Sequence, residues 1–234
     1  MRDFGAAAGR AEIPFGLPEH PERVLVLSPH PDDESIGCGG TLAQLAARGS
    51  AVDVVFMTGG AQPGDAALEA QRQEEARSAA RVLRLRNVQF LGGQDGGLHL
   101  QPQLSRPLRQ SIEENEYQVI FCPWPRDNHL DHQATFAILR DALVASHRAN
   151  IALWFYEVWS PLPANRMVDI GSSLLIKMQA IGSHMSQMRL IDYVKLARSL
   201  ARIRARSCGA PHTQYAEAFY VCDVSELPDV ERSL

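Results

Sequence analysis

The chain has 234 residues, of which 45% are hydrophobic and 21% charged, and its formal net charge is −4. This composition is typical of a globular protein with a substantial buried core, and the slightly acidic balance gives no general reason to expect binding to nucleic acid. No apolar run has the length of a signal-peptide core or a membrane span, so we expect a soluble, cytoplasmic protein without a membrane span.

Short apolar runs rich in β-branched and aromatic residues recur from Arg23 onward and predict strands. They cover residues 23–28, 51–58, 87–93, 117–124 and 151–159. Apolar residues at helical spacing predict helices over residues 39–49, 67–85 and 132–147. Because the strands are apolar on both faces and alternate with helices, we predict a doubly wound α/β fold with a mostly parallel sheet.

After Tyr156 the pattern becomes less regular. Residues 167–170 predict a short edge strand, residues 172–188 and 191–206 predict helices, and residues 216–224 predict a late strand. No linker or repeat divides the chain, so we expect one domain over residues 1–234, with 1–22 as an N-terminal extension and 157–234 completing the same domain. The four cysteines, Cys38, Cys122, Cys208 and Cys222, are widely spaced, which favours free thiols in a reducing compartment.

The segment KLARSLARIRARS concentrates positive charge between Lys195 and Arg206. One interpretation is a site for an anionic partner or a phosphate-bearing substrate. The other, which we favour from the sequence, is a surface helix with Leu196, Leu200 and Ile203 turned inward and its arginines in water.

Polar residues gather where two of the predicted strands end. The first strand runs into PHPDDE and the fourth into PWPRDNHLDH. The titratable residues of these clusters are His30, Asp32, Asp33 and Glu34, and Asp127, His129, Asp131 and His132. Since ligands bind beyond the carboxyl ends of parallel strands, the two clusters are expected to meet and form a site.

Histidine and carboxylate side chains without a thiolate are suitable ligands for a catalytic zinc, which takes three protein ligands and leaves a position for water. His30 and Asp33 lie three residues apart on a turn with Pro29 and Pro31, so both can reach one ion. His129 or His132 would be the third ligand. The remaining carboxylate could then accept a proton from water, and the remaining histidine could stabilise the developing oxyanion or leaving group.

Each of these residues also has a structural explanation. Asp131 could be the N-cap of the following helix, and Asp127 could cap a turn or hold a ligating histidine from behind. Glu34 could orient the loop through backbone amides. His30 and Asp33 could lie in a polar loop without metal, although the second cluster makes this alternative weaker.

Two other chemistries fit poorly. GCGG, residues 37–40, does not follow the first strand directly as a dinucleotide-binding loop requires, and the intervening carboxylates would repel a pyrophosphate. These glycines are better explained by a helix that approaches the sheet closely. Ser28 and Ser35 flank the cluster, but neither lies in a G-x-S-x-G nucleophile motif.

The stretch SPHPDDESIGCGGTLA resembles the (A/S)HPDDE signature of the LmbE-like (PIG-L) zinc N-deacetylases, and DNHLDHQAT resembles their second signature, D-x-H-P-D-H. RQEEARSAARVL is similar to the R-x-x-E-x-x-x-A helix of the family, and QDGGL to its Asp-Gly element. The match covers most of residues 29–134, and IGSHMSQM and YAEAFYV match more weakly. Leu130 stands where the family usually has proline.

The resemblance implies a Rossmann-like three-layer sandwich with zinc at the carboxyl ends of the strands, and removal of an N-acetyl group from an amino sugar such as an N-acetylglucosaminyl unit. By position, His30, Asp33 and His132 would hold the ion. Asp32 would be the general base, and His129 would stabilise the oxyanion or protonate the leaving amine. Arg72 and Asp95 would contact sugar hydroxyls, with Asp127 and Asp131 behind the ligands.

Several points stay open at the level of sequence. Fe²⁺ or Co²⁺ suit the same ligands as Zn²⁺. The substrate is expected to be a small N-acetylated sugar, while its acceptor group and any homo-oligomer are not specified. Alternative functions are a zinc amidase acting on a non-sugar or thiol-conjugate amide and a non-catalytic metal-binding scaffold, which would have no need of Asp32. Phosphoester hydrolysis more often uses two metals and further carboxylates.

Overall fold

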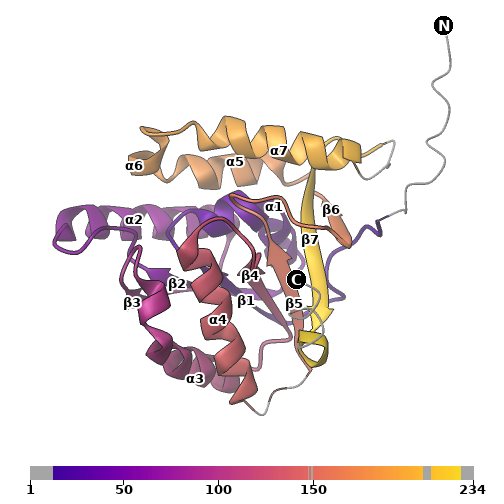
Figure 1. Cartoon of the computed structure of the whole chain (residues 1–234). Helices are drawn as coiled ribbons and strands as arrows, with labels where there is room; N and C mark the ends of the chain where they lie inside the picture. Colours follow the sequence, from indigo (N-terminus) through magenta and orange to yellow (C-terminus); the bar gives the residue numbers. More distant parts are fainter. Residues whose placement is uncertain (1–12, 147, 149, 208–211, 228–234) are drawn as a thin grey trace, which may run out of the picture.

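The structure is a computed structural model that describes residues 13–146, 148, 150–207 and 212–227 (Figure 1). Seven strands form one sheet in the order β3-β2-β1-β4-β5-β7-β6. Their bounds are β1 Arg23–Ser28, β2 Ala51–Thr58, β3 Asn87–Gly93, β4 Val119–Pro123, β5 Ala152–Tyr156, β6 Arg166–Asp169 and β7 Ala216–Asp223. Strands β1 to β5 are parallel, and β7 pairs antiparallel with β5 and β6. The predicted mostly parallel α/β sheet is confirmed.

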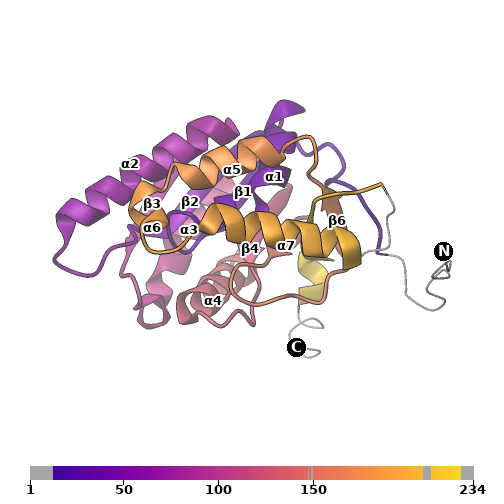
Figure 2. The same cartoon turned by 90° about the horizontal axis from the view of Figure 1, so that it is seen from above.

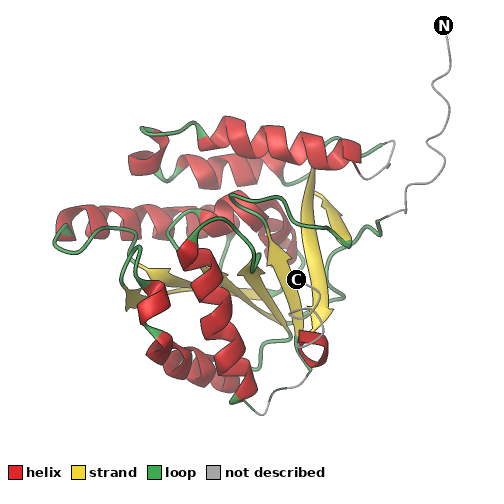
Figure 3. Cartoon of the chain, in the orientation of Figure 1, coloured by secondary structure: helices red, strands yellow, loops and turns green. Residues whose placement is uncertain are grey.

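Helices cover both faces of this sheet (Figures 1 and 3). Their bounds are α1 Asp33–Ala47, α2 Ala66–Leu83, α3 Ser105–Asn115, α4 Leu130–Val144, α5 Leu174–Gly182, α6 Met185–Met188 and α7 Tyr193–Ser207. Helices α3 and α4 pack on one face and α1 and α2 on the other, and α5 and α7 form a further layer outside α1 and α2. Viewed from above, α5 and α7 lie side by side (Figure 2).

The two faces of β1 show how the sequence produces these layers. Val24 packs with Leu42 of α1, whereas the next residue, Leu25, belongs to the core that includes Leu139 of α4. Successive side chains of a strand point to opposite faces, so a run that is apolar at every position requires cover on both sides. All four of these side chains are fully buried.

Gly37 explains how closely α1 approaches the sheet. A Cβ atom at this position would lie 2.2 Å from Cδ2 of Tyr156 in β5, a distance that real contacts do not allow. The expectation that the GCGG glycines permit close packing of a helix is therefore confirmed for Gly37.

Three helical segments differ most from the predictions. Helix α1 begins at Asp33 rather than at residue 39, and it contains Gly37, where the close packing against Tyr156 needs a glycine. Helix α3 was not predicted, since SRPLRQSIEEN is mainly polar and buries only Leu108 and Ile112. The helix predicted over residues 172–188 is divided into α5 and α6.

Helix α7 packs through a different face from the one that we favoured from the sequence, although Arg198, Arg202 and Arg206 are exposed as expected and Leu200 is half-buried. Its buried residues are Tyr193, Ala197, Ala201 and Ala205. Leu196 is 46% exposed and Ile203 62%, so the prediction that they point inward is wrong. The physical reason is that small alanine side chains allow α7 to pack closely against α5 and β7, which leaves the larger apolar side chains outside.

Cys38, Cys122 and Cys222 are free and buried, in agreement with the expected free thiols, whereas Cys208 lies outside the described residues. Among the described helices, none has both the length and the apolar character that crossing a bilayer requires.

Candidate metal centre

The two polar clusters meet where the order of the strands reverses. From β1 the chain proceeds outward through β2 to β3, and it then returns to place β4 on the other side of β1. The carboxyl ends of β1 and β4 are therefore neighbours at the switch point, where open α/β sheets bind their ligands. The predicted convergence of the PHPDDE and DNHLDH segments is confirmed.

The loop after β1 is held by its own side chains. The Ser28 hydroxyl donates to the carbonyl oxygen of His30 at 2.7 Å, and the backbone amide of Asp32 donates to Glu34 Oε2 at 3.3 Å. Glu34 thus orients the loop through a backbone amide, as one of the interpretations expected. Asp32 has a φ of 134°, a backbone conformation that residues other than glycine rarely adopt. Residues in such conformations are found most often at functional sites.

The loop after β4 is fixed by Asp127 and His129. Asp127 accepts hydrogen bonds from the backbone amides of His129 and Trp159, both at 3.0 Å, and so connects this loop to the segment after β5. His129 is the N-cap of α4, and its Nδ1 accepts from the amide of Asp131 at 3.2 Å. The other ring nitrogen of His129 is consequently the one available to a ligand.

Asp33 lies between two histidines. Its Oδ2 is 3.1 Å from Nδ1 of His30 and 3.2 Å from Nε2 of His132. Ligand atoms at ~2.0 Å from a tetrahedral ion are about 3.3 Å apart, so these separations suit three ligands of one ion. All three side chains are buried.

Each of these two histidines has another carboxylate on its opposite nitrogen. Asp131 Oδ2 lies 3.1 Å from Nε2 of His30, and Asp127 Oδ1 lies 3.4 Å from Nδ1 of His132. Metal-binding histidines almost always have such a partner, which fixes the orientation of the ring. The arrangement is therefore that of two oriented ligands facing one carboxylate.

Asp131 is not the N-cap of α4. It lies within the helix, and its carboxylate accepts hydrogen bonds from the amides of Gly96 at 2.6 Å and Leu98 at 3.1 Å. The alternative explanation of Asp131 as a cap is wrong, because His129 occupies that position. Asp131 instead joins the loop after β3 to His30.

The donor set fits a cation. Both ring nitrogens of His132 are buried without a hydrogen bond of good geometry among the described residues. Donor atoms of His30, His129 and His132 lie within 4.8 Å of one another, as do those of His30, Asp95 and Asp131. Neither of these groups contains Asp33, but its short distances to His30 and His132 place it at the same centre.

The pKa values of these groups reflect the crowding of opposite charges. Burial works against the charged form of His132, but Asp33 and Asp127 raise its pKa to about 9. Burial likewise opposes ionisation of Asp33, but His132 and His30 hold its pKa well below the usual value. The carboxylates of Asp33 and Asp127 thus favour a positive charge between the rings of His30 and His132.

Asp32 is in a different environment from its neighbour. Burial, together with the negative charge of Asp33, raises the pKa of Asp32 to about 7. The guanidinium of Arg72 lies 3.5 Å from Asp32 Oδ2, donates to the carbonyl oxygen of Pro31 at 3.0 Å, and also donates to that of Gly60. Arg72 is therefore close to Asp32 and to the loop that holds it.

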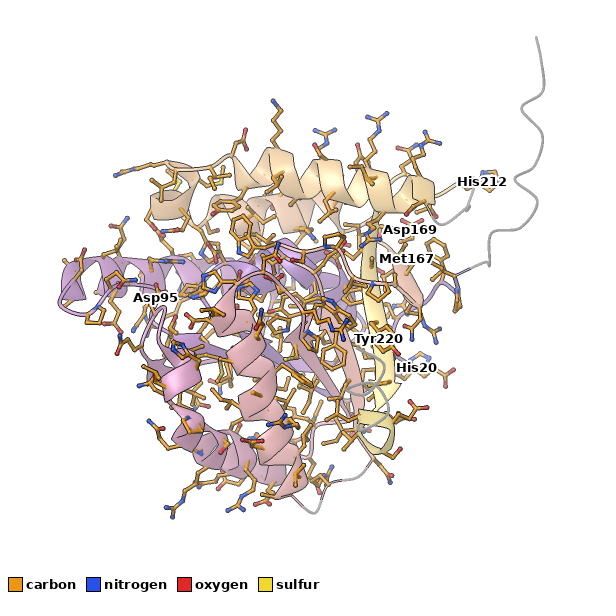
Figure 4. All side chains as sticks on the ribbon, in the orientation of Figure 1. His20, Asp95, Met167, Asp169, His212 and Tyr220 are labelled. Atoms are coloured by element: carbon orange, nitrogen blue, oxygen red, sulfur yellow. The ribbon has the colours of Figure 1, made fainter. Side chains whose placement is uncertain are left out.

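The remaining predicted residues are placed clearly. Asp95 Oδ1 is 3.4 Å from Nε2 of His30, at the edge of the site (Figure 4). His20 and His212 lie far from Asp95 in the same view, and His99 is exposed. His147 lies outside the described residues.

The sequence did not reveal the position of His184. This side chain is buried, with Nε2 3.8 Å from Glu34 Oε1, although it comes from the segment between α5 and α6. The weak family similarity of IGSHMSQM was the only feature of the sequence that drew attention to His184, and it did not show which residues His184 would lie near.

Comparison with known proteins identifies relatives of this chain. The family model described as PIG-L, GlcNAc-PI de-N-acetylase, matches residues 25–143. A diacetylchitobiose deacetylase of Thermococcus kodakarensis is 28% identical over 193 residues, which is 71% of this chain and 70% of that protein.

Solved structures share the fold. An N,N'-diacetylchitobiose deacetylase from Pyrococcus horikoshii superposes with a TM-score of 0.76 at 22% identity, over 88% of this chain and 86% of the other. A 4-carboxy-2-hydroxymuconate hydratase from Pseudomonas putida has a TM-score of 0.68 at 20% identity, over 86% and 95% of the two chains. The fold alone therefore does not determine the reaction. The family match over half of the chain does establish its relationship, and the protein belongs to the PIG-L (LmbE-like) family.

Proposed function

We propose that this protein is a metal-dependent hydrolase that removes the N-acetyl group from an N-acetylglucosaminyl-type substrate. The family description and the related diacetylchitobiose deacetylase both name deacetylation of such sugars. The observation that carries the proposal is the placement of Asp33 between His30 and His132, with the buried Asp32 beside it. A protein that only bound a metal would have no use for this second carboxylate.

His30, Asp33 and His132 would hold the ion, and the ring of His129, whose centroid lies 4.8 Å from that of His30 and 5.0 Å from that of His132, would be beside it. Asp131 and Asp127 would keep the two ligating rings in their orientation. When bound, zinc, or Fe²⁺ or Co²⁺ in the same ligands, supplies Lewis acidity toward a water molecule and the amide carbonyl.

Asp32 is the group that accepts the proton of the attacking water in this proposal. Burial and the negative charge of Asp33 raise its pKa above that of an ordinary carboxyl group, so it takes up a proton more readily. His129 would donate a hydrogen bond to the developing oxyanion or protonate the departing amine. Burial and the neighbouring charges of His30 and His132 lower the pKa of His129, which favours the neutral ring, and because Nδ1 accepts from the Asp131 amide the proton lies on Nε2, where it can be donated in a hydrogen bond to the oxyanion.

The sugar is expected to lie against Asp95, which is partly exposed beside His30. Arg72 was predicted to contact sugar hydroxyls as well. Two of its hydrogen bonds go to backbone carbonyl oxygens, so we propose that it also orients the loop that contains Asp32.

A substrate screen tests the proposal and its rivals. Zinc-loaded protein would be incubated with N-acetylglucosaminides, including N,N'-diacetylchitobiose, and with thiol-conjugate amides, and acetate or free amine would be measured. Release from the sugars supports the deacetylase, while cleavage of thiol conjugates alone would establish the amidase alternative. Bound metal without turnover of either class would favour the non-catalytic scaffold.

A further inference from the structure

The outer layer of the protein exposes an unusual amount of apolar surface. Among the described residues, seven of the twelve large hydrophobic side chains that are exposed lie between residues 175 and 203. They are Leu175, Ile176, Met185, Leu190, Ile191, Leu196 and Ile203. This layer consists of α5, α6 and α7 and forms the outer side of the molecule in Figures 1 and 2.

The same layer is strongly basic. Residues 174–207 contain seven lysines and arginines and one acidic residue, although the whole chain has a net charge of −4. Lys177 and Arg204 turn inward to Glu217 and Glu157. The other basic residues are exposed, and within the described part of the chain none of them forms an ion pair with a carboxylate: Arg189, Lys195, Arg198, Arg202 and Arg206. Figure 4 shows side chains tipped with nitrogen that project from α7 away from the body of the protein.

A pocket lies at the C-terminal end of α7. Its volume is about 440 Å³, and it is lined by Arg202, Arg206, His212, Thr213, Gln214 and Tyr215. The guanidinium of Arg198 lies 5.8 Å from the centre of the Tyr215 ring and donates to its hydroxyl at 3.3 Å. The arginines therefore offer donors for an anion next to the exposed side chain of Ile203.

We propose that α7 is an interfacial helix that binds the surface of a bilayer containing anionic phospholipids. Leu196 and Ile203 would enter the boundary between headgroups and acyl chains. Arg202 and Arg206 would contact lipid phosphates, and one phosphate would occupy the pocket that both arginines line. Such surfaces bind helices that combine basic residues, which are attracted to the anionic headgroups, with exposed apolar side chains, which enter the bilayer.

Two other occupants agree less well with the charges. A second copy related by a two-fold axis through α7 would bring arginines against arginines, and like charges in contact disfavour an interface. A nucleic acid would satisfy the arginines, but it would leave Leu196 and Ile203 in water. A lipid surface satisfies both kinds of side chain.

Vesicle flotation tests the proposal with the full chain. We expect the protein to float with vesicles of phosphatidylglycerol and phosphatidylcholine, to stay unbound with phosphatidylcholine alone, and to bind less at high salt. Arg202→Gln with Arg206→Gln should weaken partitioning roughly 30-fold, since each basic residue near the surface contributes a factor of about five. Leu196→Ser with Ile203→Ser should weaken it roughly tenfold or more.

Matched controls lie on the opposite side of the sheet. Arg106→Gln with Arg109→Gln on α3, and Leu100→Ser at a 72% exposed position, should leave partitioning unchanged. Equal recovery with both kinds of vesicle, or α7 variants that partition like the wild type, would overturn the proposal. So would a dimer in solution that Leu196→Ser with Ile203→Ser dissociates while no vesicle binding occurs. None of these readouts depends on deacetylase activity.

Discussion

Two adjacent aspartates illustrate how position rather than residue type decides chemistry. Asp33 lies between two imidazole rings that lower its pKa, while burial and the charge of Asp33 raise the pKa of Asp32 to about 7. Pairs of titratable groups whose surroundings separate their pKa values commonly divide the roles of ligand, acid and base. The sequence alone left both aspartates as candidates for either role.

Substitution of Asp32 tests this division. Asp32→Asn keeps the size of the side chain but removes the proton acceptor, so turnover should fall roughly 10²- to 10⁴-fold. The metal content, measured by elemental analysis, should stay at the wild-type level because Asp33 and the histidines are intact. A variant with full activity would refute the assignment of the base.

The carboxylate behind His30 provides a second test. Asp131→Asn should weaken metal affinity roughly 10- to 100-fold, because the carboxylate that orients the His30 ring is lost. Competition with a chelator measures this affinity. Asp141→Asn, at an exposed position of the same helix, is the control and should leave it unchanged. Equal affinities in both variants would show that Asp131 has no part in holding the ligand.

At the scale of elements, the close approach of α1 to β5 positions the first loop of the site. Gly37→Ala would place Cβ 2.2 Å from the ring of Tyr156. The free energy of unfolding should fall by about 1–3 kcal/mol, the usual result of overpacking. Gly182→Ala, in a helix with nothing within 4 Å of the new Cβ, should be neutral or slightly stabilising. Denaturant titration compares the two, and an equally stable Gly37→Ala protein would contradict the packing described here.

A buried ion pair joins three elements. Glu217 of β7 accepts hydrogen bonds from the amides of Gly40 and Thr41 in α1, both at 2.8 Å, and lies 2.5 Å from Nζ of Lys177 in α5. Lys177→Met leaves the Glu217 charge without its cation and should destabilise the protein by about 3–5 kcal/mol. Lys195→Met, at an exposed position, should change the stability by less than ~0.5 kcal/mol. Similar unfolding midpoints for both variants would argue against a structural role for the pair.

At the scale of the whole molecule, the parallel sheet and the meeting of the two loops followed from local patterns. The buried run Val24–Leu27 of β1 is apolar at every position, and the polar residues after it mark the carboxyl end of the strand. What the sequence could not show was packing between distant segments. Leu196 and Ile203 have the spacing of a buried stripe, but Ala197 and Ala201 pack inward, and His184 reaches Glu34 from 150 residues away. Periodicity indicates that a helix is amphipathic, whereas its neighbours decide which side is covered.

Acetate release measured with and without metal tests the central claim most directly. The protein would be stripped with a chelator, assayed on N,N'-diacetylchitobiose and related N-acetylglucosaminides, and assayed again after return of Zn²⁺, Fe²⁺ or Co²⁺. The account predicts no release from the stripped protein and recovery with one of these ions, in the wild type but not in Asp32→Asn. Release that persists at full rate in the stripped protein, or no release from any of these sugars by a protein holding one ion per chain, would contradict it.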